Sequence, residues 1–259
     1  MATVYLFVYG TFRKNEVNSH TKYKTQLLFE QAWVFGSLYD TTLGYPILAI
    51  EGDQRVYGEL IEVTDNQLKQ FDRLISEKNT SLHRCTRTVY TDQGKTEAYM
   101  YVARDPGMHT QVRFGDWKSY LYEKKEELFY FAYGSCMDHK RFIEAGVNDL
   151  FQDVIGRGVL SNYKLQFLIG KSDGGRADII EKSGRVEGKV YRINQKAREY
   201  LYKREGVFTG DYRPAFIDVT VNGEKKTNVL TFIVVNKEEE EIAPPNHYAE
   251  EILNGGMVH

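Results

Sequence analysis

The chain has 259 residues, 42% of them apolar and 27% charged, which is typical of a folded globular protein and excludes extended disorder as its main character. Its 34 basic and 36 acidic residues give a formal net charge of -2, so the charge favours neither nucleic acid nor an anionic membrane as a partner. No apolar run approaches the length of a membrane span, and the start, MATVYLFVYGTF, lacks the basic leader of a signal peptide.

The cysteines and histidines argue against a disulfide framework and a metal centre. Cys85 and Cys136 form no C-x-x-C spacing, and so few thiols in a chain of this length predict a reducing, cytoplasmic setting. His109 and His247 have no partner at metal-ligand spacing, so the sequence predicts no metal site.

The first half begins with LFVYGTFRKN, residues 6–15, a hydrophobic run that breaks at a Tyr-Gly-hydroxyl sequence. Residues 56–76 then read as an alternating strand, a short turn and a helix. Residues 87–103 are rich in β-formers around a turn signal, and residues 115–127 read as a helix that ends this half. We therefore expect one domain at residues 1–125 and a second at residues 126–259.

The second half repeats this order of elements. A Tyr-Gly-Ser break falls within YFAYGSCMDH, and residues 186–206 align with residues 56–76 at a constant offset of 130 (186 - 56 = 206 - 76 = 130). In the β-rich stretch that follows, Asn222-Gly223 lies between two alternating runs and predicts a hairpin. A fixed offset between similar stretches indicates duplication, so we predict an α+β protein of two tandem domains, each a small mixed β-barrel with flanking helices.

A closing helix is predicted at residues 246–256, NHYAEEILNGG, with glycine as its C-terminal cap.

The Tyr-Gly-Ser sequence of the second half is the first candidate for a functional site. The strand LFYFAY stops at Gly134-Ser135 and runs into a polar stretch, MDHKRFIEAG, so it predicts a strand-turn-helix junction. Backbone N–H groups in such a turn bind a carboxylate or a developing oxyanion, and glycine lets a ligand approach the backbone closely. Taken alone, the Tyr-Gly-Ser sequence favours an ordinary tight turn over a binding site.

Glu205 is the second candidate. It lies at the end of a predicted helix, directly before Gly206, where the helix dipole opposes a negative charge. A surface carboxylate followed by a glycine cap explains it by itself, but it falls 71 residues after Gly134 (205 - 134 = 71), within one domain-sized unit. This pairing favours a shared site.

Several stretches together resemble the gamma-glutamylcyclotransferase family: FAYGSCM, GGRADI, VEGKVYRI, REGVFTGDYRP and PPNHYAEEILNGG. In the first half VYGTFRKNEVNSH, GELIEVTDNQLKQFDRL and GDW resemble the shorter bacterial branch of the same fold. The resemblance covers nearly the whole chain as a tandem pair, and it identifies the chain as a two-domain bacterial member.

The resemblance implies a reaction and a set of roles. Family members convert a gamma-glutamyl amide, of a peptide or an amine, to 5-oxoproline and the free amine by attack of the substrate's own α-amine on its γ-carbonyl. This lyase-type cyclisation needs no cofactor, no metal and no enzyme nucleophile. The family's general base maps onto Glu205, and its substrate loop maps onto Tyr133, Gly134 and Ser135.

Further substrate contacts are expected in the second half. Cys136 and Asp178 stand where the family usually has asparagine, so the amine half of the substrate stays open. Arg213 is a candidate to position a carboxylate, with Tyr212-Arg213 aligned to His83-Arg84 of the first half. Tyr248 is a candidate to close over the pocket.

The first half departs most from the family. At offset 130 from Glu205 lies Ile75, which cannot take a proton (205 - 130 = 75). We predict that this half is catalytically silent, and that its turn at Tyr9, Gly10, Thr11 and Phe12 either binds a ligand or only packs.

Two other functions were weighed against this prediction. Cys136 with His139 three residues on could form a thiol nucleophile and its base, although no third residue is placed to orient them. Alternatively the chain senses a gamma-glutamyl metabolite without turning it over. The predicted partner in every case is a small molecule, and the assembly is a monomer or a homodimer.

Overall fold

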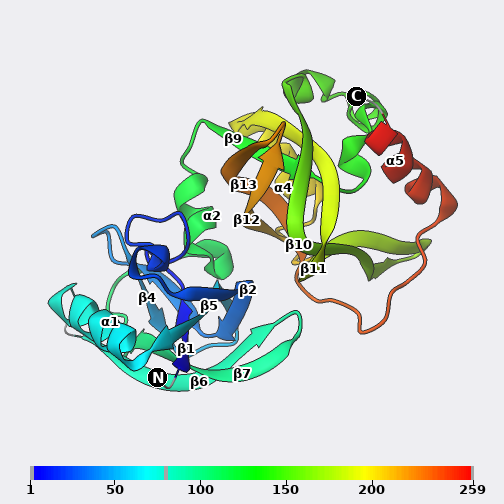
Figure 1. The fold of residues 1–259 in the computed structure, drawn as a ribbon. Coiled ribbons are helices and arrows are strands. Elements are labelled where there is room, and N and C mark those ends of the chain that lie inside the picture. The colour runs from blue at the N-terminus through cyan, green and yellow to red at the C-terminus, as the bar shows by residue number, and fades with distance from the viewer. Residues whose placement is uncertain (1–2, 79–80, 258–259) are drawn as a thin grey trace. The chain divides into compact units, whose positions relative to one another are not determined.

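The computed structural model describes residues 3–78 and 81–257. The chain folds into two compact units, Met1–Leu121 and Tyr122–His259. Both units are mixed α+β structures built around a small barrel, as predicted (Figure 1). None of the helices among the described residues combines the length and the apolar character needed to cross a membrane.

The first unit is built on a ring of five paired strands. In ring order they are β1 (Thr3–Val8), β5 (Arg55–Thr64), β2 (Gln26–Phe35), β6 (Leu82–Thr91) and β7 (Gly94–Ala103). Neighbours are antiparallel except β7 and β1, which close the ring in parallel with Leu6 opposite Tyr99. The sheet extends from β7 through β4 (Pro46–Ala49), β3 (Ser37–Asp40) and β8 (Thr110–Gln111).

Helix α1 (Asp65–Lys78) follows β5 without a loop. Its start is capped by Thr64 and Gln67, because the Gln67 amide donates to Thr64 Oγ1 while the Gln67 side chain accepts from the Thr64 amide. The apolar residues Leu68, Phe71 and Ile75 recur on one face and pack on the barrel. Shorter helices complete the unit: η1 (His20–Tyr23), η2 (Arg113–Gly115) and α2 (Trp117–Tyr122).

The second unit has the same ring of strands. In ring order they are β9 (Glu127–Ala132), β11 (Gly174–Asn194), β10 (Val154–Lys171), β12 (Tyr212–Val221) and β13 (Glu224–Val234). Again the ring closes in parallel, between β13 and β9, with Leu230 opposite Tyr130. Asn222 and Gly223 form the tight turn between β12 and β13 with φ of 51° and 81°, as the Asn-Gly pair predicts.

Helix α4 (Gln195–Arg204) follows β11 directly and is capped by Asn194, whose side chain accepts from the Ala197 amide. The other helices are η3 (Ser135–Met137), α3 (His139–Glu144), η4 (Asn148–Phe151) and α5 (Asn246–Met257). Contrary to prediction, glycine does not cap α5, which continues through Gly255 and Gly256. Gly255 serves close packing instead, because an added Cβ would lie 2.5 Å from Met137.

The duplication extends to individual contacts. The Tyr9 hydroxyl donates to the Tyr101 carbonyl over 2.7 Å, and the Tyr133 hydroxyl donates to the Phe232 carbonyl over 2.5 Å. Tyr101 and Phe232 are therefore matched positions on β7 and β13. Each lies two residues before the last residue of its strand, Ala103 in the first unit and Val234 in the second.

Strand register then corrects the predicted alignment of the halves. Leu82 lies opposite Ala103, and Tyr212 lies opposite Val234, so Leu82 is the counterpart of Tyr212. His83 therefore matches Arg213, one residue away from the predicted pairing.

Glycine is needed at two matched positions of the rings. A Cβ on Gly58 would lie 2.4 Å from the Val8 carbonyl oxygen, and one on Gly188 would lie 2.2 Å from that of Ala132. Each glycine thus allows its strand to approach the strand that leads into the turn.

Candidate functional site

A tight turn at the end of β9 forms one wall of the candidate site. The Met137 amide donates to the Gly134 carbonyl over 3.0 Å and the Asp138 amide donates to the Ser135 carbonyl over 3.1 Å. The amides of Ser135 and Cys136 precede the first of these bonds, so they are in the position of unbonded helix-start donors. Glycine fits at 134 because an added Cβ would lie only 3.2 Å from the Tyr248 hydroxyl.

The end of α4 brings a carboxylate to this turn. Gly206 takes a left-handed conformation with φ of 62°, which ends the helix directly after Glu205. The Glu205 side chain is 19% exposed, and burial raises its pKa above the ordinary glutamate value. The Arg204 guanidinium and a hydrogen bond from Cys136 act in the opposite direction.

Cys136 joins the turn to the carboxylate. Its thiol donates to Glu205 Oε1 over 3.4 Å, and it accepts from Arg204 Nε over 3.2 Å. Burial and then the Glu205 charge raise the pKa of the Cys136 thiol to about 12. The His139 ring packs edge to face against Phe142, with the ring centroids 6.3 Å apart. Cys136 is therefore a protonated hydrogen-bonding residue, which argues against a thiol nucleophile.

Aromatic side chains form the remaining walls. The Tyr212 hydroxyl donates to the Ala177 carbonyl over 2.7 Å, while the Ala177 amide donates to the Tyr248 hydroxyl over 3.2 Å. That second bond uses the Tyr248 oxygen and leaves its hydrogen to donate. The pocket has about 330 Å³ of empty space, counting the part open to solvent. It is lined by Tyr130, Tyr133, Gly134, Ser135, Cys136, Ala177, Glu205, Tyr212, Phe232 and Tyr248.

Six of the eight residues predicted for this site line the pocket. They are Tyr133, Gly134, Ser135, Cys136, Glu205 and Tyr248. Asp178 and Arg213 are not among the described residues of the lining. Asp178 is fully buried, accepts from the Val234 amide over 2.9 Å and pairs with Lys237, so it joins β11 to β13. Arg213 follows Tyr212 on a strand, where successive side chains point to opposite faces.

Other residues of the site were not assigned to it from the sequence. Tyr130 and Tyr212 belong to the lining, and Arg204 reaches both Cys136 and Ser135, whose Oγ lies 3.4 Å from its guanidinium. The adjacency of Arg204 to Glu205 was a usable signal, because a cation beside a buried carboxylate stabilises its charged form. Nothing in the strand pattern separates Tyr130 from the packing aromatics around it.

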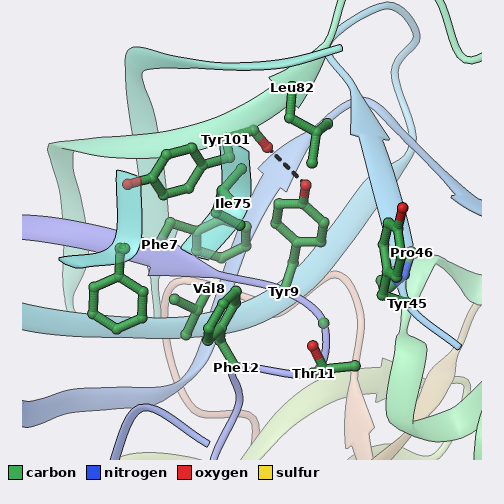
Figure 2. A pocket seen from close by; sticks show the side chains of 12 residues that line it. Phe7, Val8, Tyr9, Thr11, Phe12, Tyr45, Pro46, Ile75, Leu82 and Tyr101 are labelled. Atoms are coloured by element: carbon green, nitrogen blue, oxygen red, sulfur yellow. Dashed lines mark hydrogen bonds between the residues drawn. The ribbon is translucent and has the colours of Figure 1, made fainter. Parts of the chain in front are cut away.

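The first unit has a pocket at the matching place (Figure 2). Its turn keeps the same bond, from the Arg13 amide to the Gly10 carbonyl over 3.0 Å. Ile75 lies in the wall, where the offset of 130 puts the counterpart of Glu205. The lining is Phe7, Val8, Tyr9, Gly10, Thr11, Phe12, Tyr45, Pro46, Phe71, Ile75, Leu82 and Tyr101.

Beside this turn lies a buried charge cluster that was not predicted. Arg13 lies 3.3 Å from Glu59 and 3.0 Å from Asp116, and Glu59 is also 3.2 Å from His20 and 3.8 Å from Lys118. Burial opposes the Glu59 charge, but the His20 hydrogen bond and the two cations outweigh it and lower the pKa of Glu59 to about 2. The opposite charges of Arg13, Glu59 and Asp116 lie in contact and connect the loop that follows the turn to β5 and to Asp116.

Comparison with known proteins gives two matching family models. The model described as gamma-glutamyl cyclotransferase, AIG2-like, matches residues 6–119, and the AIG2-like family model matches residues 185–258. YkqA of Bacillus subtilis, named provisionally as a gamma-glutamylcyclotransferase, is 41% identical over 259 residues, which cover 98% of this chain and 92% of that one. Its crystal structure superposes with a TM-score of 0.89, covering 98% of this chain and 91% of YkqA.

Two relatives match about half of the chain. The gamma-L-glutamyl-butirosin B gamma-glutamyl cyclotransferase of Niallia circulans is 38% identical over 121 residues, which cover 44% of this chain and 76% of that enzyme. The gamma-glutamylcyclotransferase of Bos taurus is 31% identical over 137 residues, which cover 50% of this chain and 70% of that enzyme.

Proposed function

The chain belongs to the gamma-glutamylcyclotransferase family, and from this premise we propose that its second unit converts a gamma-glutamyl amide to 5-oxoproline and a free amine. The observation that carries the proposal is the meeting of Glu205, a half-buried carboxylate of raised pKa, with the backbone amides of the Tyr133-Gly134-Ser135 turn in one pocket. The relatives named above are gamma-glutamylcyclotransferases by name, which supports this class of reaction.

The chemistry requires a base and a site for negative charge. The substrate's α-ammonium first gives a proton to Glu205, and the freed amine attacks the γ-carbonyl to form the ring C–N bond. The carbonyl oxygen becomes an oxyanion facing the amides of Ser135 and Cys136. The original amide C–N bond then breaks as Glu205 returns the proton to the departing amine. The ring nitrogen passes its own extra proton through Glu205 to the same amine, so that 5-oxoproline with a neutral ring amide and an ammonium product leave. Attack within one molecule supplies much of the rate.

In the proposed reaction Glu205 must both accept a proton and return it, and the groups around its carboxylate suit both steps. A base works best when its pKa lies near the working pH, and burial moves the pKa of Glu205 upward from the ordinary value. Arg204 Nε, 3.9 Å from Glu205 Oε1, and the Cys136 thiol limit that rise. They keep part of the carboxylate ionised and able to accept the proton.

We propose further that the first unit does not catalyse this reaction, because Ile75 replaces the base.

Both cysteines are unpaired, which supports a reducing compartment such as the cytoplasm.

The test is release of 5-oxoproline from a panel of gamma-glutamyl dipeptides and amines by the purified chain and by Glu205→Gln. We expect the substitution to lower kcat/KM by at least about 100-fold, the scale of general base catalysis. Glu199→Gln, on the exposed face of α4, is the matched control and should keep wild-type turnover.

Turnover that survives Glu205→Gln would refute the assignment of the base. Absence of 5-oxoproline with every substrate, together with a calorimetric binding signal from a gamma-glutamyl compound, would instead support a sensing protein.

A further inference from the structure

We propose that the pocket of the first unit is a second ligand site, which takes a small uncharged molecule with an apolar body and a carbonyl end. The pocket is lined by residues of β1, its following turn, α1 and β7, among others (Figure 2). The proposal concerns binding only and does not depend on the reaction proposed for the second unit.

The space itself is the first argument. Protein interiors are close-packed, so a site that has lost its catalytic residue and has no other use tends to fill with side chains. Here about 530 Å³ of empty space is present, counting the part open to solvent, against about 330 Å³ in the second unit. The first unit therefore keeps an open pocket at the matched place, although Ile75 stands at the position of Glu205.

The wall chemistry excludes a gamma-glutamyl substrate. At three matched positions, polar residues of the second unit are replaced by Phe12, Ile75 and Leu82. An ammonium group placed here would face no carboxylate of the lining, and burial of an unpaired charge is strongly unfavourable. Asp72 is near but already accepts from the Tyr101 hydroxyl over 2.9 Å and from Arg84 over 2.6 Å.

The shape and nature of the walls favour an aromatic or branched body. Phe12 and Phe71 meet edge to face with their ring centroids 5.2 Å apart. Figure 2 shows Phe12 together with Phe7, Tyr9 and Ile75 around the same space, and Phe71 also lines it. An aromatic ligand gains both from burial of its area and from edge-to-face contact with such rings.

The turn supplies hydrogen-bond donors that can bind a carbonyl oxygen of the ligand. Within the described part of the chain, no hydrogen bond involves the amide of Thr11 or of Phe12, and both residues line the pocket. The Thr11 hydroxyl accepts from Asn18 over 3.1 Å, which leaves its hydrogen to donate. The Tyr9 hydroxyl is used, since it donates to the Tyr101 carbonyl and accepts from the Leu48 amide. Donors without acceptors match a carbonyl oxygen, and because no cationic side chain is among the lining residues, an uncharged carbonyl suits the pocket better than a carboxylate.

The experiment compares two probes of similar size on the full chain by isothermal titration calorimetry: phenylacetamide and 2-phenylethylamine. We expect the amide to bind at least about 10-fold more tightly than the ammonium, because the ammonium has no partner in the lining. Ile75→Glu should weaken phenylacetamide binding by at least about 10-fold, since it places a carboxylate against the apolar ring. Ile50→Glu, the same change outside the lining, should leave binding unaltered.

A second variant guards against misfolding of the first. Leu82→Tyr introduces the residue that the second unit carries at this position, fills part of the space and should also weaken phenylacetamide binding. Fluorescence of Trp33 and Trp117, the two tryptophans of the chain and both in the first unit, checks that this unit is folded. If phenylacetamide does not bind, or if both variants are folded and bind it as the wild type does, the proposal is wrong.

Discussion

The two units hold their turns at the same place by different means. In the first unit Arg13, the third residue after Gly10, pairs with Glu59 on β5 and with Asp116. In the second unit Met137, the third residue after Gly134, packs against α5, where the backbone of Gly255 comes close to it. Lys189, the counterpart of Glu59, donates to the Met137 carbonyl over 2.6 Å.

This difference shows which features of a duplicated fold are retained in both copies and which have changed with the function of each copy. Both units keep the strand ring, the glycine at 58 or 188, and the tyrosine that bonds across to the closing strand. These features depend on backbone geometry, which tolerates little change. The pocket walls and the support beneath each turn are made by side chains, and there the two copies differ in charge and in size.

The largest effect should follow from breaking the charge cluster of the first unit. Glu59→Ala leaves Arg13 and Lys118 buried without their shared carboxylate, and we expect it to lower the free energy of unfolding of this unit by about 3–5 kcal/mol. Denaturant unfolding followed by tryptophan fluorescence measures it, because Trp33 and Trp117 both lie in the first unit.

Two variants serve as controls for this prediction. Glu62→Ala, on the same strand, removes a bond from the exposed Thr3 hydroxyl and should cost less than about 1 kcal/mol. Lys189→Ala tests the matched position of the second unit and should leave the tryptophan transition unchanged, with a loss of about 1 kcal/mol in the transition seen by circular dichroism. Equal effects of Glu59→Ala and Glu62→Ala would show that the cluster does not stabilise the first unit.

Much of the fold could be predicted because short stretches of neighbouring residues determine it. The offset of 130 locates Ile75 in the pocket wall, and Asn222-Gly223 predicts the hairpin between β12 and β13. The turn at Gly134 and the helix end at Glu205 each follow from a few neighbouring residues. Such features need no knowledge of distant contacts.

The remainder depends on contacts between residues far apart in the sequence. The charge cluster joins Arg13 to Asp116 across 103 positions, and no local pattern marks either residue as buried. Asp178 was predicted at the pocket because of its motif, but its pairing with Val234 and Lys237 could be seen only in the folded chain. The alignment of His83 with Arg213 follows from strand register. A register shift of one residue moves every side chain of a strand to the opposite face of the sheet, and the sequence alone does not fix the register.

A smaller effect is expected from Arg204, which has no counterpart among the pocket residues of the first unit. Its positive charge lowers the pKa of Glu205, which burial raises. Glu205 acts unprotonated in the proposed reaction, so kcat/KM should rise with pH through this pKa. Without the cation the pKa rises further, and Arg204→Gln should move the acid limb of the kcat/KM profile to higher pH.

The control for this shift is Lys203→Gln, which removes an exposed positive charge one residue earlier. Solvent and salt screen exposed charges, so we expect its acid limb to coincide with that of the wild type. An acid limb that moves equally in both variants would attribute the shift to net charge and not to the contact between Arg204 and Glu205.

The smallest effect should come from treating the second unit's thiol with iodoacetamide. Burial and the Glu205 charge raise the pKa of the Cys136 thiol to about 12, so the thiol stays protonated at pH 8 and reacts slowly. We expect 5-oxoproline release to persist through a treatment that fully labels the unfolded chain, with mass spectrometry showing Cys136 unmodified. Because the thiol donates to Glu205, Cys136→Ala should reduce turnover without abolishing it. Loss of turnover in step with labelling of Cys136 would instead favour a nucleophilic thiol, and Glu205 would then act on the sulfur and not on the substrate amine.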